Sequence, residues 1–226
     1  MITVLFKSIK KIHLTIVNLL IISGFAIGEP IGGVIESTGV TSLVRESERL
    51  ESDVGTDVNI YDEAETANGR MLIEFLDEEK LSLTENSLVY IDEAYYDPDP
   101  SKSKMAISMV RGTARFASGA GNRIKKQNVD VSTPTANITM RGTDFTTTID
   151  ELGRTMVVLL PDEETGASSG EIVVYNDGGE VVLTEAYSAT VVSSYDTPPT
   201  QSVIIQGITP NLIDNMFIVN PPSEIR

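Results

Sequence analysis

The sequence predicts an all-β fold, and three observations support this prediction. From Ile31 onward the chain consists of short apolar or alternating runs separated by turn residues, which is typical of a sandwich, barrel or β-solenoid. Aromatic residues make up only 6% of the chain against 41% hydrophobic residues, so the core must consist mainly of Val, Ile, Leu and Met, which favour strands. No long helical period follows residue 28. We therefore expect one globular domain with an added segment at each end.

The N-terminal segment has the layout of a secretory signal peptide. Three lysines precede an apolar run at 12–22, and small residues follow it. Cleavage after Ala26 or Gly28 would satisfy the small-x-small rule. The alternative is an uncleaved anchor, although a membrane-spanning helix needs about 20 apolar residues. In both cases we expect a signal helix and an exported protein that is periplasmic, outer-surface or secreted.

The strands of the N-terminal half follow from the apolar runs. We expect strands at 33–35, 40–44, 71–76, 81–91 and 106–116. The first two would form a hairpin that turns near Gly39, and the segment Asp-Glu-Glu-Lys at 77–80 would connect the next two. A loop at 97–102 precedes the fifth, because its two prolines cannot join a central ladder.

A change of strand face at Gly142 is the most specific local feature. Ile138 and Met140 share one parity, whereas Phe145 and Ile149 have the opposite parity. Strand side chains alternate with a period of two, so one extra residue must be absorbed between these segments. Since glycine tolerates the backbone that this requires, we predict a bulge or a tight corner here.

The Arg-Gly-Thr triplet at this corner has a copy thirty residues upstream, at 111–113, and an aromatic residue follows both copies. The echo suggests one structural unit used twice.

The C-terminal part contains the clearest hairpin. Runs at 171–175 and 180–184 flank an Asn-Asp-Gly-Gly turn. A linker with two prolines and one last strand at 203–205 follow the main domain. We expect a signal peptide or anchor, a β domain and a C-terminal extension, at 1–28, 29–192 and 193–226.

The chain is strongly acidic after the N-terminal segment. All 33 acidic residues and 14 of the 17 basic residues lie after residue 28, which gives this part a net charge of −19. Such a surface repels nucleic acid and anionic membranes. We therefore expect no nucleic-acid partner, and membrane attachment only through an uncleaved N-terminal segment.

The composition excludes several enzyme classes. The only histidine is His13, and the chain has no cysteine. Histidine-activated serine nucleophiles, cysteine proteases and His/Cys zinc sites are therefore ruled out for the exported part. Carboxylate pairs, as in glycosidases, will occur by chance among 33 acids, and no acid stands out by motif. We predict that the protein is not an enzyme.

Weak calcium binding is the remaining inorganic option, and otherwise we expect no cofactor. Residues 53–59 alternate oxygen-bearing side chains but lack the glycine that an EF-hand loop needs at its sixth position. Asp92, Asp97 and Asp99 could cluster around a cation, or they could be ordinary solvated acids.

A basic island interrupts the acidic sequence between Asp99 and Asp130, where no acid occurs. Its members are Lys102, Lys104, Arg111, Arg115, Arg123, Lys125 and Lys126. They could pair with acids across strands. Alternatively, they could form a docking face for an acidic protein partner or an anionic glycan.

The central motif resembles the FecR domain, whose hallmark is Thr-Pro-x-Ala running into Arg-Gly-Thr-x-Phe inside an all-β module. The matching residues are Thr133, Pro134, Ala136, Arg141, Gly142, Thr143 and Phe145. The resemblance spans about 31–192. It implies a FecR-like β-sandwich or β-solenoid (roll) of short antiparallel strands, in which we expect the motif to be structural.

The resemblance also implies a function. FecR-type proteins are best known as membrane-spanning regulators that control a sigma factor in the cytoplasm and sense a loaded receptor from the periplasm. Only eleven residues precede the apolar run, too few for a folded sigma-binding domain. We therefore expect a non-enzymatic exported binding module that recognises a protein or glycan in the cell envelope. Two alternatives stay open: a structural subunit of an envelope, extracellular or phage assembly, and the exported sensor part of a FecR-type iron-uptake signalling system.

Overall fold

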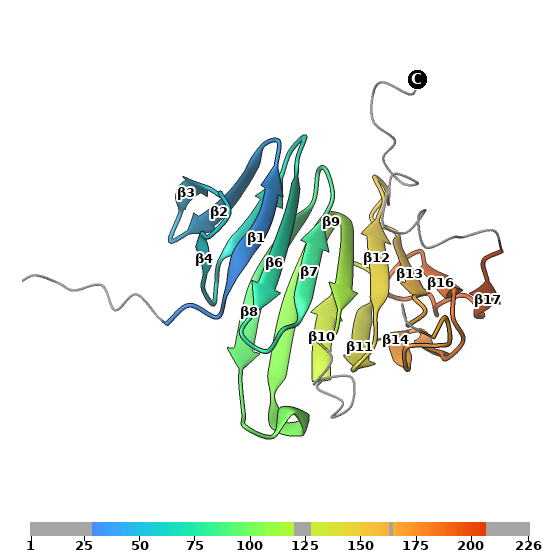
Figure 1. The fold of residues 1–226 in the computed structure, drawn as a ribbon. Coiled ribbons are helices and arrows are strands. Elements are labelled where there is room, and N and C mark those ends of the chain that lie inside the picture. Colours follow the sequence, from blue (N-terminus) through green and yellow to red (C-terminus); the bar gives the residue numbers. More distant parts are fainter. Residues whose placement is uncertain (1–28, 120–127, 163–164, 207–226) are drawn as a thin grey trace, which may run out of the picture.

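The computed structural model describes residues 29–119, 128–162 and 165–206 (Figure 1). Within these ranges the chain forms seventeen β-strands and one short 3-10 helix, η1 (Pro100–Lys102). The all-β prediction is therefore confirmed. The predicted signal helix lies outside the described residues. No helix in the described ranges is long and apolar enough to cross a membrane.

The strands form two layers, which we call sheet A and sheet B. Sheet A contains, in spatial order, β4 (Asp57–Val58), β1 (Gly32–Thr38), β6 (Arg70–Phe75), β7 (Lys80–Leu83), the second half of β9 (Lys104–Ala117), β12 (Phe145–Ile149), β13 (Thr155–Leu159), β16 (Ser188–Val192) and β17 (Val203–Ile204). Sheet B contains β3 (Glu48–Glu51), β2 (Thr41–Arg45), β5 (Glu63–Thr66), β8 (Leu88–Tyr95), the first half of β9, β10 (Asn128–Ser132), β11 (Asn137–Arg141), β14 (Ile172–Asn176) and β15 (Gly179–Leu183).

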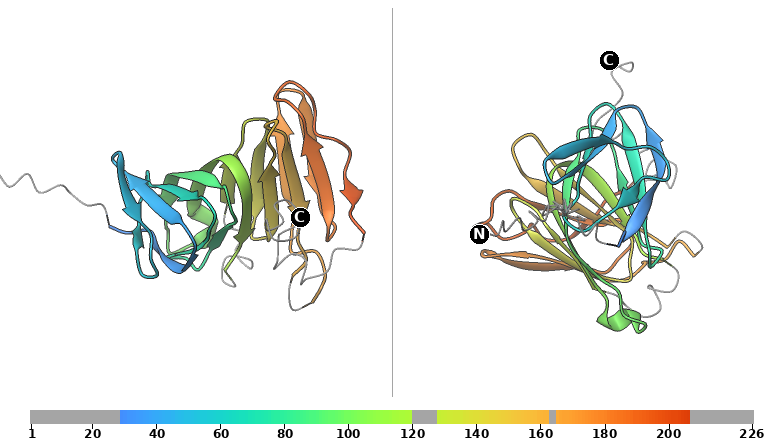
Figure 2. Two further views of the ribbon diagram at one scale, coloured as in Figure 1. Left: turned by 90° about the horizontal axis from the view of Figure 1, so that it is seen from above. Right: turned by 90° about the vertical axis from the view of Figure 1, so that its left-hand side faces the viewer.

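Neighbouring strands in the described ranges run antiparallel, with the single exception of β9 and β10, which pair in parallel. The chain advances along one axis, so that β1–β4 lie at one end and β14–β17 at the other (Figures 1 and 2). Alternate residues of both sheets point inward and form one hydrophobic cluster, which includes Leu43, Ile107 and Ile138 from sheet B and Ile73 and Phe145 from sheet A. The architecture is a two-layer β-roll, one of the alternatives that the FecR resemblance implied.

Strand β9 belongs to both sheets. Its first half pairs with β8 and β10 in sheet B, and its second half pairs with β7 and β12 in sheet A. The strand crosses between the layers at Gly112, where φ is +90°. A side chain at this position would meet the backbone and Oγ of Ser87, so only glycine fits the crossing.

One buried ion pair ties the N-terminal end of the roll together. Arg45 of β2 donates two hydrogen bonds of 2.7 Å to the carboxylate of Asp62, which is fully buried. The Asn59 backbone N–H donates to the same carboxylate. Arg45 also donates to the Asp57 carbonyl, so that one side chain fixes β2, β4 and the approach to β5.

The predicted opening hairpin is wrong. Strand β1 pairs with β4 and β6 in sheet A, whereas β2 pairs with β3 and β5 in sheet B. Between them, Gly39 (φ +71°) turns the chain from one layer to the other and packs against the Asn68 carbonyl. Alternation in the sequence showed where these strands lie but not with which strands they pair.

The predicted strand 81–91 is likewise two strands in different layers. Residues 84–87 break it, because Asn86 adopts a positive φ of 57° and the chain passes from β7 in sheet A to β8 in sheet B. The predicted hairpin of β14 and β15 is confirmed, with Asn176 opposite Gly179.

Candidate functional site

The Thr-Pro-x-Ala part of the motif forms the tight turn of the β10–β11 hairpin. The Thr133 backbone N–H and hydroxyl both donate to the Ala136 carbonyl, and the Ala136 N–H donates to the Thr133 hydroxyl. Pro134 occupies the exposed part of this turn. Thr155 of β13 donates its hydroxyl to Thr133 at 2.8 Å, which attaches the hairpin turn of sheet B to sheet A.

The Arg-Gly-Thr part is a corner between the two sheets rather than a bulge. Gly142 has φ +58°, and the chain leaves β11 in sheet B and enters β12 in sheet A beside it. Thr143 is fully buried, whereas the side chain of Arg141 is exposed and makes no ion pair or hydrogen bond in the described part of the chain. The motif therefore serves to turn the chain, and its arginine faces solvent.

The upstream copy of the triplet has the same role. Gly112 carries β9 from sheet B to sheet A, as Gly142 does between β11 and β12. The two aromatic residues that follow, Phe116 and Phe145, are direct cross-strand partners whose rings stack with centroids 4.8 Å apart. The repeated Arg-Gly-Thr triplet therefore marks two places where the chain passes from sheet B to sheet A in the same way. The aromatic rings that follow the two triplets pack together in the core.

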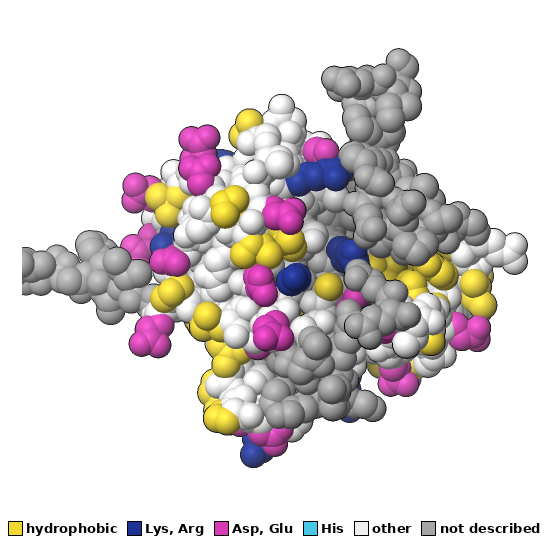
Figure 3. Space-filling model, in the orientation of Figure 1, with side chains coloured by type: hydrophobic (Ala, Val, Ile, Leu, Met, Phe, Trp, Pro, Cys, Tyr) yellow, Lys and Arg dark blue, Asp and Glu magenta, His cyan; other side chains and the backbone are white. Residues whose placement is uncertain are grey.

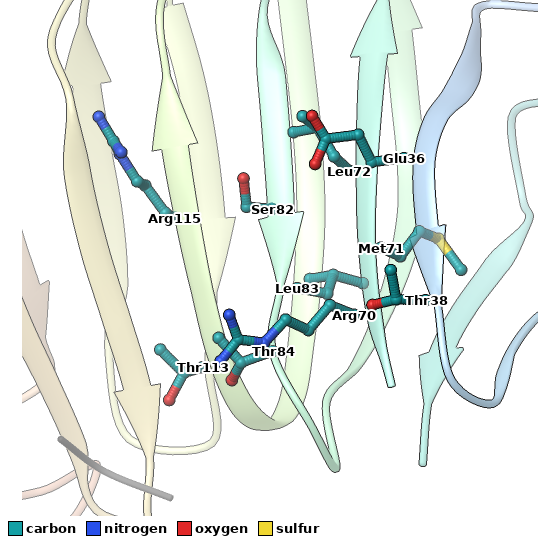
Figure 4. A pocket seen from close by; sticks show the side chains of 10 residues that line it. All are labelled: Glu36, Thr38, Arg70, Met71, Leu72, Ser82, Leu83, Thr84, Thr113 and Arg115. Carbon is teal, nitrogen blue, oxygen red and sulfur yellow. The ribbon is translucent and has the colours of Figure 1, made fainter. Parts of the chain in front are cut away.

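A groove lies on the outer face of sheet A, across β1, β6, β7 and the second half of β9 (Figure 4). It consists of two adjoining hollows of about 410 Å³ each, which share Leu72, Ser82 and Arg115. We call it the sheet A groove. Ser82 lies between Arg115 on one side and Glu36 on the other, and Arg70 extends below it towards Thr84 and Thr113 (Figure 4).

Strand alternation explains why polar side chains line this groove. In β7, Leu81 and Leu83 point into the core, so that Lys80, Ser82 and Thr84 point outward. The neighbouring strands add hydroxyl groups and charges of both signs in the same way. The charged lining residues are Glu36, Arg70, Glu74, Glu78, Lys80, Arg115 and Asp144.

Charges of opposite sign lie next to one another in the groove. Arg70 lies 3.4 Å from Glu85, and Arg115 lies 3.9 Å from the carboxylate of Asp144. Asp144 is fully buried and accepts a hydrogen bond from the Ser118 backbone N–H. Acidic, basic and apolar side chains are interspersed over this face of the molecule (Figure 3). The groove can therefore form ion pairs with a ligand that carries either charge.

The described members of the basic island lie apart from one another. Lys102 ends η1 and lies 3.8 Å from Asp99, whereas Lys104 begins β9. Arg111 lies on sheet B, whereas Arg115 lines the groove of sheet A. Arg123, Lys125 and Lys126 lie outside the described residues. Docking through these residues stays a prediction.

Arg111 takes part in a three-residue charge network with Glu65 and Arg49. Arg49 donates to one carboxylate oxygen of Glu65 at 2.5 Å, and Arg111 donates to the other at 2.7 Å. The hydrogen bond from Arg49 and the charges of both arginines hold the pKa of the Glu65 carboxyl below its ordinary value, although partial burial acts in the opposite direction. Arg111 therefore pairs with an acidic residue of another strand, which is the first of the two arrangements considered for the basic island.

The three aspartates considered for calcium have local partners. Asp92 accepts a hydrogen bond from Ser108, and Asp97 accepts one from the Asp99 backbone N–H. No cluster of three acidic side chains suited to a metal occurs among the residues that the structure describes. Weak calcium binding stays a prediction, which an unchanged melting temperature in millimolar calcium would contradict.

The sequence did not identify most of the groove. It named Arg115, but not Arg70, Ser82 or the hydroxyl groups beside them. The sequence did show that Lys80, Ser82 and Thr84 alternate with Leu81 and Leu83, which indicates that these three polar side chains lie on the outer face of the sheet. However, the groove became recognisable only after the strand order placed β6, β7 and β9 side by side.

The FecR protein family model matches residues 62–161, which contain both Arg-Gly-Thr corners and most of the groove. Two crystal structures of a candidate anti-sigma factor from Parabacteroides distasonis ATCC 8503, at 1.65 and 2.50 Å resolution, are similar at 14% identity. The similar parts cover 61% and 60% of this chain, with TM-scores of 0.46 and 0.44. This chain spans 57% and 56% of those two chains, a little more than half of their length. No curated protein matches the sequence.

Proposed function

The FecR protein family model matches residues 62–161 of this chain, and from this match we propose that the protein is a non-enzymatic binding module with a role in FecR-type signalling. FecR proteins are regulators rather than enzymes. The lack of any cysteine, and of any histidine after His13, agrees with this role, because the usual nucleophiles and general bases are missing from the rest of the chain.

The observation that carries the proposal is the sheet A groove. It runs across four neighbouring strands, β1, β6, β7 and the second half of β9, so its shape is set mainly by rigid elements rather than by loops. Because the groove crosses several neighbouring strands on the outer face of the sheet, it suits an extended ligand. We propose that an exposed segment of a partner protein binds there.

A protein ligand fits the charges of the groove better than an anionic glycan does. The lining residues include both signs, with Arg70 and Arg115 beside Glu36, Glu74 and Glu78. A polypeptide can present complementary charges of both signs, whereas an anionic glycan would be repelled by a chain with a net charge of −16.

Export is part of the proposal, and its support is the signal-like sequence of residues 1–28. The partner would accordingly lie in the cell envelope. Cell fractionation followed by N-terminal sequencing of the isolated protein tests this point, and recovery of the full-length chain from the cytoplasm would contradict it.

The signalling role is tested by deleting the gene in its native host and measuring transcript levels. We expect a defined set of transcripts to change and to be restored by the wild-type gene. If deletion changes no transcript under any growth condition tested, including iron limitation, the signalling role is wrong.

The groove is tested by complementing the same deletion with two variants. Ser82→Trp fills the middle of the groove without removing a charge, and we expect it to fold but not to restore the transcripts. Val110→Trp adds the same ring at an exposed valine of β9 away from the groove, and we expect it to restore them. Restoration by Ser82→Trp would show that the signal does not pass through the groove.

A further inference from the structure

Of the four sheet edges in the described part of the chain, three are protected against pairing with another strand. The two edges of sheet A, β4 and β17, are only two residues long. Strand β3, at one edge of sheet B, has three charged residues among its four. Very short edge strands and charged side chains are the usual means of preventing unwanted strand pairing.

The fourth edge, β15, lacks these protections. Its sequence is Gly-Glu-Val-Val-Leu, with one charged residue, no lysine and no proline. It pairs with β14 in an unbroken five-residue register. Val182 is 41% exposed at this edge, and Tyr175 of the adjacent β14 is 40% exposed. This combination of a regular backbone and exposed apolar side chains is what an added strand requires.

The hairpin geometry identifies the available backbone groups. The two-residue turn makes Asn176 and Gly179 a hydrogen-bonded pair, so the alternate residues Glu180 and Val182 direct their N–H and C=O groups away from β14. No hydrogen bond to these outward groups occurs in the part of the chain that the structure describes. Two donors and two acceptors are thus arranged for a further strand.

The charge around β15 indicates what kind of strand would bind. Residues 155–206 contain eight acidic residues and no lysine or arginine. Exposed acids lie on and around the β14–β15 hairpin, namely Glu171, Asp177, Glu180, Glu185 and Asp196. Such a surface of a single sign attracts a basic segment and repels a second copy of this acidic chain.

We infer that β15 binds an extended segment of a partner protein by β-strand addition, and that this segment alternates apolar residues with lysine or arginine. Main-chain hydrogen bonds to Glu180 and Val182 would supply the pairing, and the surrounding acids would select a basic strand. This surface is separate from the sheet A groove and does not depend on the function proposed for it.

The test uses the full chain and a synthetic peptide, Lys-Val-Arg-Val-Lys-Val-Arg, as the probe. We expect it to bind with an affinity that falls as salt is added, and to slow hydrogen exchange of the Glu180 and Val182 amides. Methylating alternate peptide nitrogens on the pairing edge should weaken binding roughly tenfold or more, because each methyl group removes a main-chain hydrogen-bond donor. The acidic analogue Glu-Val-Glu-Val-Glu-Val-Glu should not bind.

Variants of the protein provide the matched comparison. Val182→Pro removes only an outward N–H, which an edge strand tolerates, and should weaken binding roughly tenfold or more. Val182→Lys should weaken it through charge repulsion, whereas Val110→Lys, at a valine that is also 41% exposed, should not. Circular dichroism checks that each variant folds.

Several outcomes would overturn the inference. These are no binding at millimolar peptide, equal binding of the N-methylated peptide, and protection of amides elsewhere without protection of β15. Dimerisation of the free protein that itself protects Glu180 and Val182 would assign the edge to a second copy of the chain and would equally reject a partner strand.

Discussion

Replacing Gly112 by alanine should lower the free energy of unfolding by about 3–6 kcal/mol. The residue has φ +90°, a conformation that costs an L-amino acid about 1–2 kcal/mol. The new Cβ would also overlap the Cα and Oγ of Ser87 and lie 2.7 Å from the Asn86 carbonyl oxygen, and overpacking of this kind costs about 1–3 kcal/mol. Ser87 would have to move, which weakens its two hydrogen bonds of 3.0 Å to the Thr113 backbone by about 1 kcal/mol in total.

Gly153 provides a matched control for this prediction. Its φ of +79° is similar, but no atom lies within 4 Å of the position that a Cβ would take, so Gly153→Ala should cost only about 1–2 kcal/mol. Urea unfolding of both variants, followed by circular dichroism, measures the difference. With a urea dependence of about 2–3 kcal/mol per molar, the two midpoints should differ by roughly 1 M. Equal losses for the two variants would show that the crossing adapts to a methyl group, and the role assigned to Gly112 in β9 would then be wrong.

Three further substitutions test other parts of the fold. Phe145→Ala removes a fully buried, stacked ring and should cost about 3–5 kcal/mol in urea unfolding, whereas a loss below about 1 kcal/mol would contradict its place in the core. Asp62→Ala leaves the guanidinium of Arg45 without its buried carboxylate and should cost about 3–5 kcal/mol, and the double variant with Arg45→Met should recover part of that loss. Glu65→Gln tests a pH dependence: the pKa of Glu65 is lower in the folded protein than in the unfolded chain, so its ionised form stabilises the fold above the unfolded pKa of about 4.3, and this contribution is lost as the pH falls. The stability difference between wild type and Glu65→Gln should therefore shrink as the pH is lowered below about 4, and a difference that grows on acidification would contradict the role of Arg49.

Local sequence patterns predicted the strands better than their partners. The Asn-Asp-Gly-Gly turn fixed the β14–β15 hairpin, because a two-residue connection leaves one possible pairing. At Gly39 the same kind of evidence was misleading. A glycine between two apolar runs can close a hairpin or carry the chain into another sheet, and the choice depends on contacts with Asn68, far along the sequence.

The candidate site was predictable only in part, for the same reason. The motif around Gly142 predicted the match to the FecR family model and the corner, since both depend on residues that are neighbours in the sequence. The groove depends on strands that are brought together from different parts of the chain, with Glu36, Ser82 and Arg115 on three of them. No alternation pattern within one strand specifies such an arrangement.

The sharing of β9 between the two sheets has a consequence for how the molecule unfolds. In the described ranges, no strand from β1 to β8 pairs with any strand from β10 to β17, so both hydrogen-bonded ladders are continuous only through β9. Without β9, the strands next to it, β7 and β8 in one half and β10 and β12 in the other, would lack the hydrogen-bonded neighbour that β9 supplies. We expect the domain to unfold in a single cooperative transition, and fragments that divide the chain at β9 to remain unfolded until they are mixed.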